Sequence, residues 1–234
     1  LKPFAATNLL VFNSLAAANA SLTALVESGA AAIELLDKTS LQVAQREDRA
    51  MAEMKALSIE NQAALIVEYQ ELTEDALHQR VSASEKIING LSLATPAIAA
   101  ETLGRRNDLW HIRKGLYATV AGARQAGTTA LLEDIAVPVS ELAATCESLI
   151  GLFGKFNYHD SVIFGHAKDG NIHFMLNEDF REVSSQNRYR HFTEEMVDLV
   201  LGFDGTLKAE HGTGRVMAPF VRKQFGDDLY SVMV

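Results

Sequence analysis

The chain has 234 residues, of which 48% are hydrophobic and 22% charged, a composition typical of a globular protein long enough to bury a core. Its formal net charge of -9 at pH 7 argues against a nucleic-acid partner, because binding phosphates requires a basic surface. The single cysteine, Cys146, excludes an internal disulfide, a cysteine-based zinc site and an iron–sulfur cluster within this sequence.

No run approaches the roughly 20 apolar residues of a membrane span, so none is predicted. The start of the sequence, Leu1 to Phe4, lacks the basic region and apolar stretch of a signal peptide. A strand-like run follows at residues 5–12, so we expect the sequence to open inside a domain of a larger protein. We expect a cytoplasmic location, with peripheral association with a membrane as the alternative.

Strand-like and helix-like segments alternate along the chain. Apolar runs predict strands at residues 8–12, 31–36, 63–70, 128–137, 161–165 and 171–176, with a strand or linker at 91–96. Helical patterns cover residues 15–27, 39–57, 74–88, 97–123 with a break near Gly104, 140–156 with Ser140 as its cap, and 182–201. A turn at Asp204-Gly205 precedes a short strand, and the tail after Gly212 reads as mostly helical.

The turn Ala167-Lys168-Asp169-Gly170 joins two of these strands in a tight hairpin, because Asp-Gly is a strong turn signal. The hairpin favours antiparallel pairing. The predicted fold class is therefore α+β, a mostly antiparallel sheet flanked by helices. Two successive β-α-β-like stretches, before and after about residue 90, suggest a two-lobed sheet domain.

Two histidines bracket this hairpin in the segment GHAKDGNIH, residues 165–173. A hairpin lets the imidazoles of His166 and His173 face one side, and imidazole is a common ligand for borderline metals. A lone strand histidine such as His166 is usually a hydrogen-bonded structural residue, but a second histidine across the hairpin makes a metal or catalytic site about as favoured as that structural role. The spacing does not show that they meet any other motif in space.

A second candidate segment is KAEHGTGR, residues 208–215. Glu210 supplies a carboxylate and His211 an imidazole, and two histidines with one carboxylate form a familiar metal set with open positions. Gly212 and Gly214 can let the backbone approach a ligand or cofactor closely, and a helix beginning there would favour an anion.

Both segments resemble the C-terminal half of FAD-linked 2-hydroxy-acid oxidases and dehydrogenases, the glycolate, D-lactate and D-2-hydroxyglutarate enzymes of the vanillyl-alcohol-oxidase-like superfamily. Residues 109–113, LWHIR, and residues 133–139, EDIAVPV, resemble two further motifs of this family in the right order. The resemblance implies a ferredoxin-like cap or substrate domain that spans residues 1–234, next to an FAD-binding domain that this sequence does not contain.

The resemblance also implies residue roles. His166, His173 and Glu210 match the family's metal ligands, with zinc, iron or manganese as the divalent ion. His211 matches the general base, and Arg113 matches an arginine that binds the substrate carboxylate. We predict Arg124 and Lys208 as additional anion contacts. Asn171, Gly212 and Gly214 are predicted to line the cofactor FAD.

Three departures from some relatives concern the substrate. Leu132 stands where those relatives have a lysine, Tyr117 where they have a threonine, and Met175 where they have an asparagine. The resemblance implies oxidation of a D-2-hydroxy acid to the 2-oxo acid, and these departures leave open whether the acid is of the 2-hydroxyglutarate, lactate or glycolate type. Expected partners are the acid itself, the FAD-binding domain, and an iron–sulfur domain or electron-transfer protein.

The sequence ends before the family's usual C-terminal Asn-Pro-Gly segment, and we expect this chain to be inactive without the flavin domain. Two alternatives stay open at this point. One is a metal-dependent hydrolase, because two histidines and a glutamate can also activate water. The other is a non-catalytic partner subunit of a flavoprotein.

Overall fold

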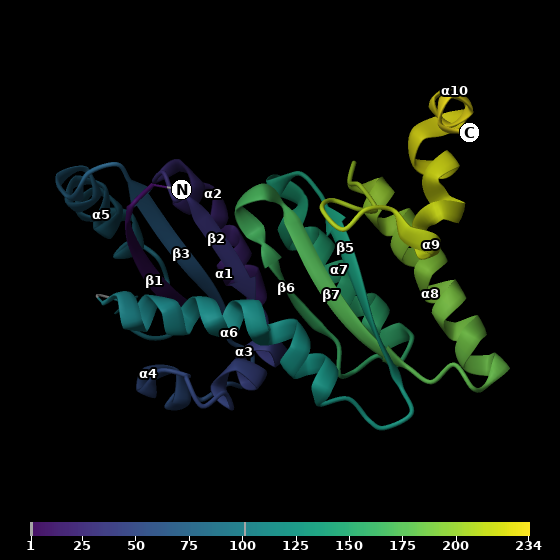
Figure 1. The fold of residues 1–234 in the computed structure, drawn as a ribbon, viewed down its shortest axis with the longest axis horizontal. Coiled ribbons are helices and arrows are strands. Elements are labelled where there is room, and N and C mark those ends of the chain that lie inside the picture. The colour runs from purple at the N-terminus through teal and green to yellow at the C-terminus, as the bar shows by residue number, and fades with distance from the viewer. Residues whose placement is uncertain (1, 101) are drawn as a thin grey trace. The chain divides into compact units, whose positions relative to one another are not determined.

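The computed structural model describes residues 2–100 and 102–234 (Figure 1). The chain forms two compact units. Unit 1 contains Leu1–Gln125 and Val162–Lys168, and unit 2 contains Ala126–Ser161 and Asp169–Val234. The first boundary between the units therefore falls at Gln125, later than the division near residue 90 that the sequence suggested.

Unit 1 is built on a sheet with the strand order β4-β1-β3-β2-β6, and the pairings between these neighbours are antiparallel. Its strands are β1 (Phe4–Phe12), β2 (Ala32–Leu36), β3 (Ala63–Glu71), β4 (Ile98–Ala100) and β6 (Val162–His166). Because β1 and β2 both run antiparallel to β3, they are parallel to each other with β3 between them. This is the split β-α-β arrangement of a ferredoxin-like domain, as predicted.

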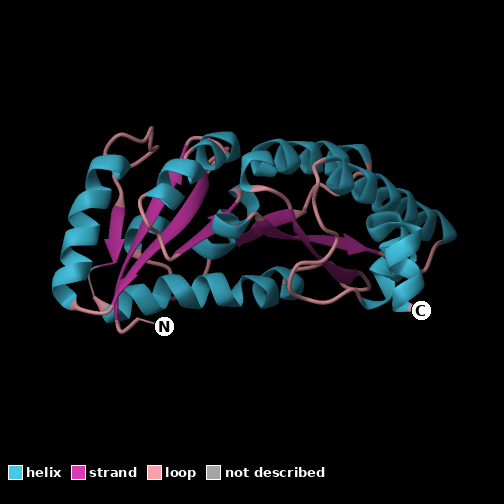
Figure 2. Cartoon of the chain, turned by 90° about the horizontal axis from the view of Figure 1, so that it is seen from above, coloured by secondary structure: helices cyan, strands magenta, loops and turns pink. Residues whose placement is uncertain are grey.

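Helices cover both faces of this sheet (Figures 1 and 2). They are α1 (Leu15–Ala20), α2 (Leu22–Glu27), α3 (Lys38–Gln45), α4 (Ala52–Lys55), α5 (Glu74–Ile88) and α6 (Leu103–Gly122). Neighbouring side chains of a strand point to opposite faces. Tyr69 meets Ser28 at the end of α2, whereas Glu68 meets Trp110 of α6, so α2 and α6 lie on opposite faces.

Unit 2 pairs β5 (Thr129–Ala136) with β7 (Asn171–Glu178) in antiparallel register. Its long helices α7 (Leu142–Lys155) and α8 (Val183–Gly202) pack together. Phe153, Phe174 and Phe192 form an aromatic cluster in its core, with ring centroids 5.6 to 6.2 Å apart. The chain then continues through α9 (Gly214–Met217) and α10 (Val221–Met233), which is kinked at Gly226.

The segment Ala167–Asp169 that precedes β7 is a short 3-10 helix rather than a plain turn. Gly170 follows it with a φ of 69°, and a Cβ there would lie 1.9 Å from the carbonyl oxygen of Val137. Only glycine fits this close approach.

Several predicted boundaries were wrong. The helix expected at 15–27 is two helices that meet at Ser21, and the helix expected at 39–57 is interrupted between α3 and α4. Gly104 lies in the first turn of an unbroken α6, and the strand Ile98–Ala100 lies where the helix was expected to begin. Residues 91–96, expected as a strand or linker, form a linker. Ser140 lies in a 3-10 turn and does not cap α7 with its side chain. Helix starts and strand edges depend on packing that local patterns do not contain.

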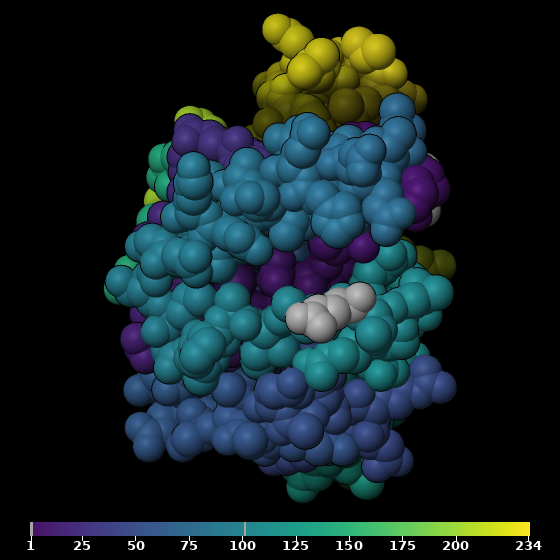
Figure 3. Space-filling model, turned by 90° about the vertical axis from the view of Figure 1, so that its left-hand side faces the viewer, coloured from purple at the N-terminus to yellow at the C-terminus, as the bar shows by residue number. Residues whose placement is uncertain are grey.

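Across the described residues, no helix has both the length and the hydropathy needed to cross a bilayer. Unit 1 has a hollow between the first residues of β1, helix α5 and the start of α6 (Figure 3). This hollow has a volume of about 540 Å³ and includes the partly exposed ring of Phe4.

Candidate functional site

One buried carboxylate in unit 2 ties the Glu210-His211 loop to β5. Oδ2 of Asp134 accepts the backbone N–H groups of Ala209, Glu210 and His211 at 3.0, 2.8 and 2.9 Å. Oδ1 accepts the side-chain amide of Asn171 at 2.7 Å. Burial raises the pKa of Asp134, but these four hydrogen bonds outweigh the burial and hold the pKa below its usual value. Asp134 is therefore charged at neutral pH and fixes three consecutive residues.

The same carboxylate adjoins His173, which lies opposite Asp134 in the β5–β7 register. Nδ1 of His173 lies 3.5 Å from Oδ1 of Asp134, and Nε2 lies 3.0 Å from Oε1 of Glu210. The ring of His211 stacks on that of His173, with centroids 4.8 Å apart and planes within 6°. Nε2 of His211 lies 3.6 Å from Oε1 of Glu210. Unit 2 thus brings together three of the residues that the sequence assigned to metal and base.

The geometry of this cluster fits a divalent metal. Ligand atoms of Asp134, His173 and His211 all lie within 4.8 Å of one another. Asp134 already accepts four hydrogen bonds, so we regard it as an orienting group, and His211 is the predicted base, so neither is counted as a metal ligand. His173 and Glu210 are the better metal ligands, because two ligands each about 2.1 Å from one ion lie about 3.0 Å apart in octahedral and about 3.4 Å apart in tetrahedral coordination. The observed Nε2 to Oε1 distance is 3.0 Å.

Unit 1 contains a second polar cluster, centred on Glu34 of β2. Oε2 of Glu34 accepts Nε of Arg113 at 2.7 Å, and Oε1 contacts Nδ1 of His166 at 2.7 Å. His166 lies opposite Glu34 in the β2–β6 register. The guanidinium of Arg113 also lies 5.1 Å from the ring centroid of Phe164. The predicted substrate arginine and the predicted first metal ligand therefore share one buried carboxylate. The ligand set that would combine His166 with residues of unit 2 stays a prediction.

The other predicted contacts have the following surroundings. Lys208 is mostly buried and its Nζ lies 2.7 Å from Oε2 of Glu133. Arg124 is exposed and donates to the carbonyl of Ala121 at the end of α6. Asn171 donates from its amide to Asp134 and to the carbonyl of Ile135. Their roles toward substrate or cofactor stay predictions.

Gly212 and Gly214 adopt φ values of 70° and 61°, which favour glycine. Among the described residues, nothing lies within 4 Å of a Cβ added at either position. These glycines therefore shape the loop, and their predicted contact with a cofactor stays a prediction. The helix that begins at Gly214 has only four residues, so it is too short to act as an anion site of the kind the sequence suggested.

Sequence reasoning gave Glu34 and Asp134 no role. Each is an acidic residue within an otherwise apolar strand, in the runs AIELL and TALLEDIA. A charged side chain in a buried strand requires partners, so this pattern alone would have marked both residues for attention.

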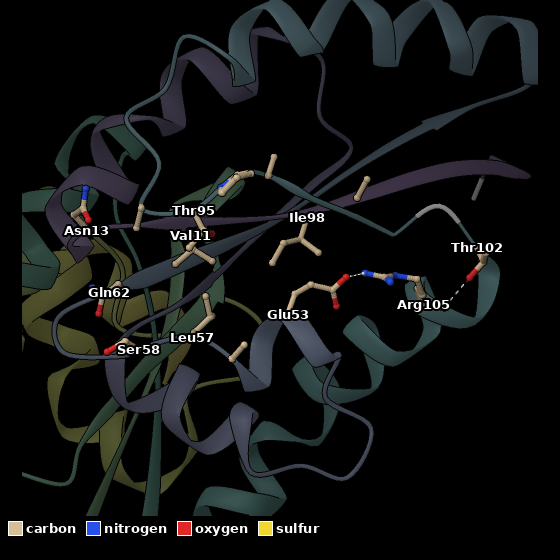
Figure 4. Close-up of a pocket in the computed structure, with 15 residues that line it drawn as sticks. Val11, Asn13, Glu53, Leu57, Ser58, Gln62, Thr95, Ile98, Thr102 and Arg105 are labelled. Atoms are coloured by element: carbon tan, nitrogen blue, oxygen red, sulfur yellow. Dashed lines mark hydrogen bonds and ion pairs between the residues drawn. The ribbon is translucent and has the colours of Figure 1, made fainter.

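The described part of unit 1 also contains a cavity of about 820 Å³. Figure 4 shows Val11, Leu57 and Ile98 around it, with the Glu53–Arg105 ion pair of 2.6 Å at one end. None of the predicted site residues lines this cavity in the part of the chain that the structure describes.

Comparison with known proteins decides the family. Residues 1–234 match the family described as FAD linked oxidases, C-terminal domain. The chain belongs to this family. The glycolate oxidase subunit GlcD of Bacillus subtilis is 25% identical over 82% of the chain and 38% of its own length. A probable mitochondrial D-lactate dehydrogenase of Danio rerio is 29% identical over 95% of the chain and 43% of its own length. The chain thus spans about two fifths of these relatives.

Solved structures share the fold of this chain. A substrate-bound p-cresol methylhydroxylase matches 99% of the chain and 49% of its own chain, with a TM-score of 0.64 and 10% identity. An alkyldihydroxyacetonephosphate synthase matches 88% of the chain and 40% of its own, with a TM-score of 0.59 and 12% identity. The resemblance inferred from the motifs and the α+β fold class are both confirmed. FAD is the cofactor that the family implies, and a companion FAD-binding domain is the partner it implies.

Proposed function

We propose that this chain is the substrate- and metal-binding domain of a flavoenzyme that oxidises a D-2-hydroxy acid to the 2-oxo acid. The observation that carries the proposal is the cluster of His173, Glu210 and His211, held in place by Asp134. The printed names of the relatives, a glycolate oxidase subunit and D-lactate dehydrogenases, support a small 2-hydroxy acid as substrate. They also favour this function over the hydrolase alternative.

A common pattern at the two predicted metal-ligand histidines supports the metal. In unit 1, Nδ1 of His166 contacts Glu34 at 2.7 Å, and in unit 2, Nδ1 of His173 faces Asp134 at 3.5 Å. Metal-binding histidines usually donate one ring N–H to a carboxylate, a backbone carbonyl or water, which orients the ring and leaves the other nitrogen as the ligand. The His166–Glu34 hydrogen bond has this form, and the His173–Asp134 contact is a longer ion-pair contact. A divalent metal would supply Lewis acidity that lowers the pKa of the substrate hydroxyl, and the flavin of the companion domain would accept the hydride from Cα.

The residues of this chain would bind the acid and move its proton. Arg113 would hold the substrate carboxylate through its terminal N–H groups, because its Nε is already bonded to Glu34. His211 would take the hydroxyl proton on Nε2, the nitrogen that faces Glu210. The hydroxyl proton thus goes to His211 and the electron pair of the Cα–H bond leaves with the hydride, which balances oxidation to the 2-oxo acid.

The test uses the full-length, flavin-containing protein. A panel of D-lactate, glycolate and D-2-hydroxyglutarate is assayed by dye reduction, and bound metal is measured in wild type and in His173→Ala. We expect turnover of at least one acid and a loss of metal in the variant. Equal metal content in the two proteins would remove His173 from the metal site, and no turnover of any acid would reject the substrate class.

A further inference from the structure

Glu34 bonds to two residues that come from distant parts of the chain. Its side chain is 4% exposed. One oxygen accepts Nε of Arg113 on α6, and the other contacts Nδ1 of His166 on β6, both at 2.7 Å. We infer that Glu34 is a positioning residue that fixes the orientation of Arg113 and the tautomer of His166. This inference rests on the proposed function, in which these two residues bind substrate and metal.

The tautomer follows from hydrogen-bond chemistry. An ionised carboxylate only accepts hydrogen bonds, so its contact with Nδ1 of His166 requires the proton to be on Nδ1. In a neutral imidazole the lone pair is then on Nε2, which is the form that binds a metal. An amide at position 34 can instead donate to Nδ1, which moves the proton to Nε2 and blocks that nitrogen as a ligand.

The orientation of Arg113 is fixed in two directions. The bond from Nε to Glu34 lies in the guanidinium plane, while the ring of Phe164, 5.1 Å from the guanidinium carbon, supports its face. A guanidinium held at Nε keeps its terminal N–H groups for recognition of a carboxylate. Arg113 donates to Glu34 alone among the side chains of the described residues, so Glu34 is the group that sets its position.

The chain offers a matched control in Glu68. This glutamate lies on β3, and the β2–β3 register places it on the same face of the sheet as Glu34. Its side chain is also 4% exposed, and it accepts Nε1 of Trp110 on α6 at 2.6 Å and the hydroxyl of Thr7 at 2.8 Å. Glu68 thus fastens the same helix to the same sheet, without a bond to Arg113 or His166 among the described residues.

The experiment compares Glu34→Gln with Glu68→Gln in the flavin-containing holoenzyme. The affinity for Zn²⁺ is measured by competition with a chromogenic chelator, and KM and kcat are measured with the best 2-hydroxy acid. For Glu34→Gln we expect Zn²⁺ affinity to fall about 10- to 100-fold, as is typical when the partner of a metal-binding histidine is removed, and KM to rise about tenfold. Glu34→Gln and Glu68→Gln should lower thermal stability by similar amounts, because each weakens the bonds of one buried carboxylate. Glu68→Gln should nevertheless change the Zn²⁺ affinity and KM by less than about threefold.

Equal changes of Zn²⁺ affinity and KM in Glu34→Gln and Glu68→Gln would overturn the inference, because Glu34 would then be only a structural contact. If wild type binds no Zn²⁺, the metal part of the proposed function fails, and the KM comparison alone decides the role of Glu34. If Glu34→Gln does not fold, Glu34→Asp replaces it with Glu68→Asp as control. The carboxylate of Glu34→Asp is shorter and should reach only one of Arg113 and His166, which should raise KM. A KM equal to that of Glu68→Asp would reject Glu34 as a positioning residue.

Discussion

Replacement of Asp134 by Asn tests whether one carboxylate organises the site. Three backbone N–H groups converge on Oδ2 of this fully buried side chain. A hydrogen bond to a charged group contributes about 1.5–3 kcal/mol and one to a neutral group about 0.5–1.5 kcal/mol, so neutralisation costs about 1 kcal/mol for each bond. The variant should therefore lose about 3 kcal/mol of unfolding free energy. The introduced amide would also meet the side-chain amide of Asn171, donor against donor.

The assay is urea unfolding together with Zn²⁺ affinity, in the full-length protein. Glu133→Gln is the control, because this neighbouring buried carboxylate contacts Lys208 and Tyr189 and, among the described residues, accepts no backbone N–H from the loop. Asp134→Asn should weaken Zn²⁺ binding at least tenfold because Glu210 and His211 lose their anchor, while Glu133→Gln should leave the affinity close to wild type. If Asp134→Asn unfolds at the wild-type urea concentration, or binds Zn²⁺ as tightly as the control, the reasoning is refuted.

Three further predictions concern single residues. Burial raises the pKa of Asp37 from 3.8 to about 6, so the stability that this carboxyl contributes is present below pH 3.8 and lost as the pH rises through 6. Between these pH values the unfolding free energy of wild type should fall by up to about 3 kcal/mol relative to that of Asp37→Asn. Parallel pH profiles of unfolding free energy for the two proteins would contradict this. Gly170→Ala should destabilise by about 3 kcal/mol or more in thermal unfolding, because its Cβ would overlap the carbonyl of Val137, whereas Gly154→Ala, in open space, should not destabilise the protein. His211→Ala should retain metal and lower kcat at least 100-fold, and a variant that keeps its activity would exclude His211 as the base.

The sequence predicted those features that depend on local pattern. Most strands lie where apolar runs occur, and α5 has the predicted bounds of Glu74–Ile88, where Thr73 caps an uninterrupted helical pattern. The histidine and Glu-His motifs were found because their residue types are rare and chemically distinctive. The family assignment came from four such motifs in order.

The features that the sequence missed depend on contacts between distant residues. Glu34 is 79 residues from Arg113 and 132 residues from His166, so no local window relates them. Asp134 holds a loop that lies 75 to 77 residues away. The break between α3 and α4 likewise reflects tertiary contacts, because Gln45 at the end of α3 donates to the carbonyls of Met54, Lys55 and Leu57.

The most direct test of the account is anaerobic flavin reduction in the full-length protein. Three samples of the enzyme are compared: the native protein, the protein after metal removal with a chelator, and the chelated protein after Zn²⁺ is added back. Each sample is mixed with a D-2-hydroxy acid, and the rate at which visible flavin absorbance is lost is measured. The account predicts rapid reduction by the native protein, a large loss of rate after chelation, and recovery on metal addition in wild type but not in His173→Ala. An unchanged rate after complete metal removal would contradict the assignment of His173 and Glu210 to a catalytic metal site.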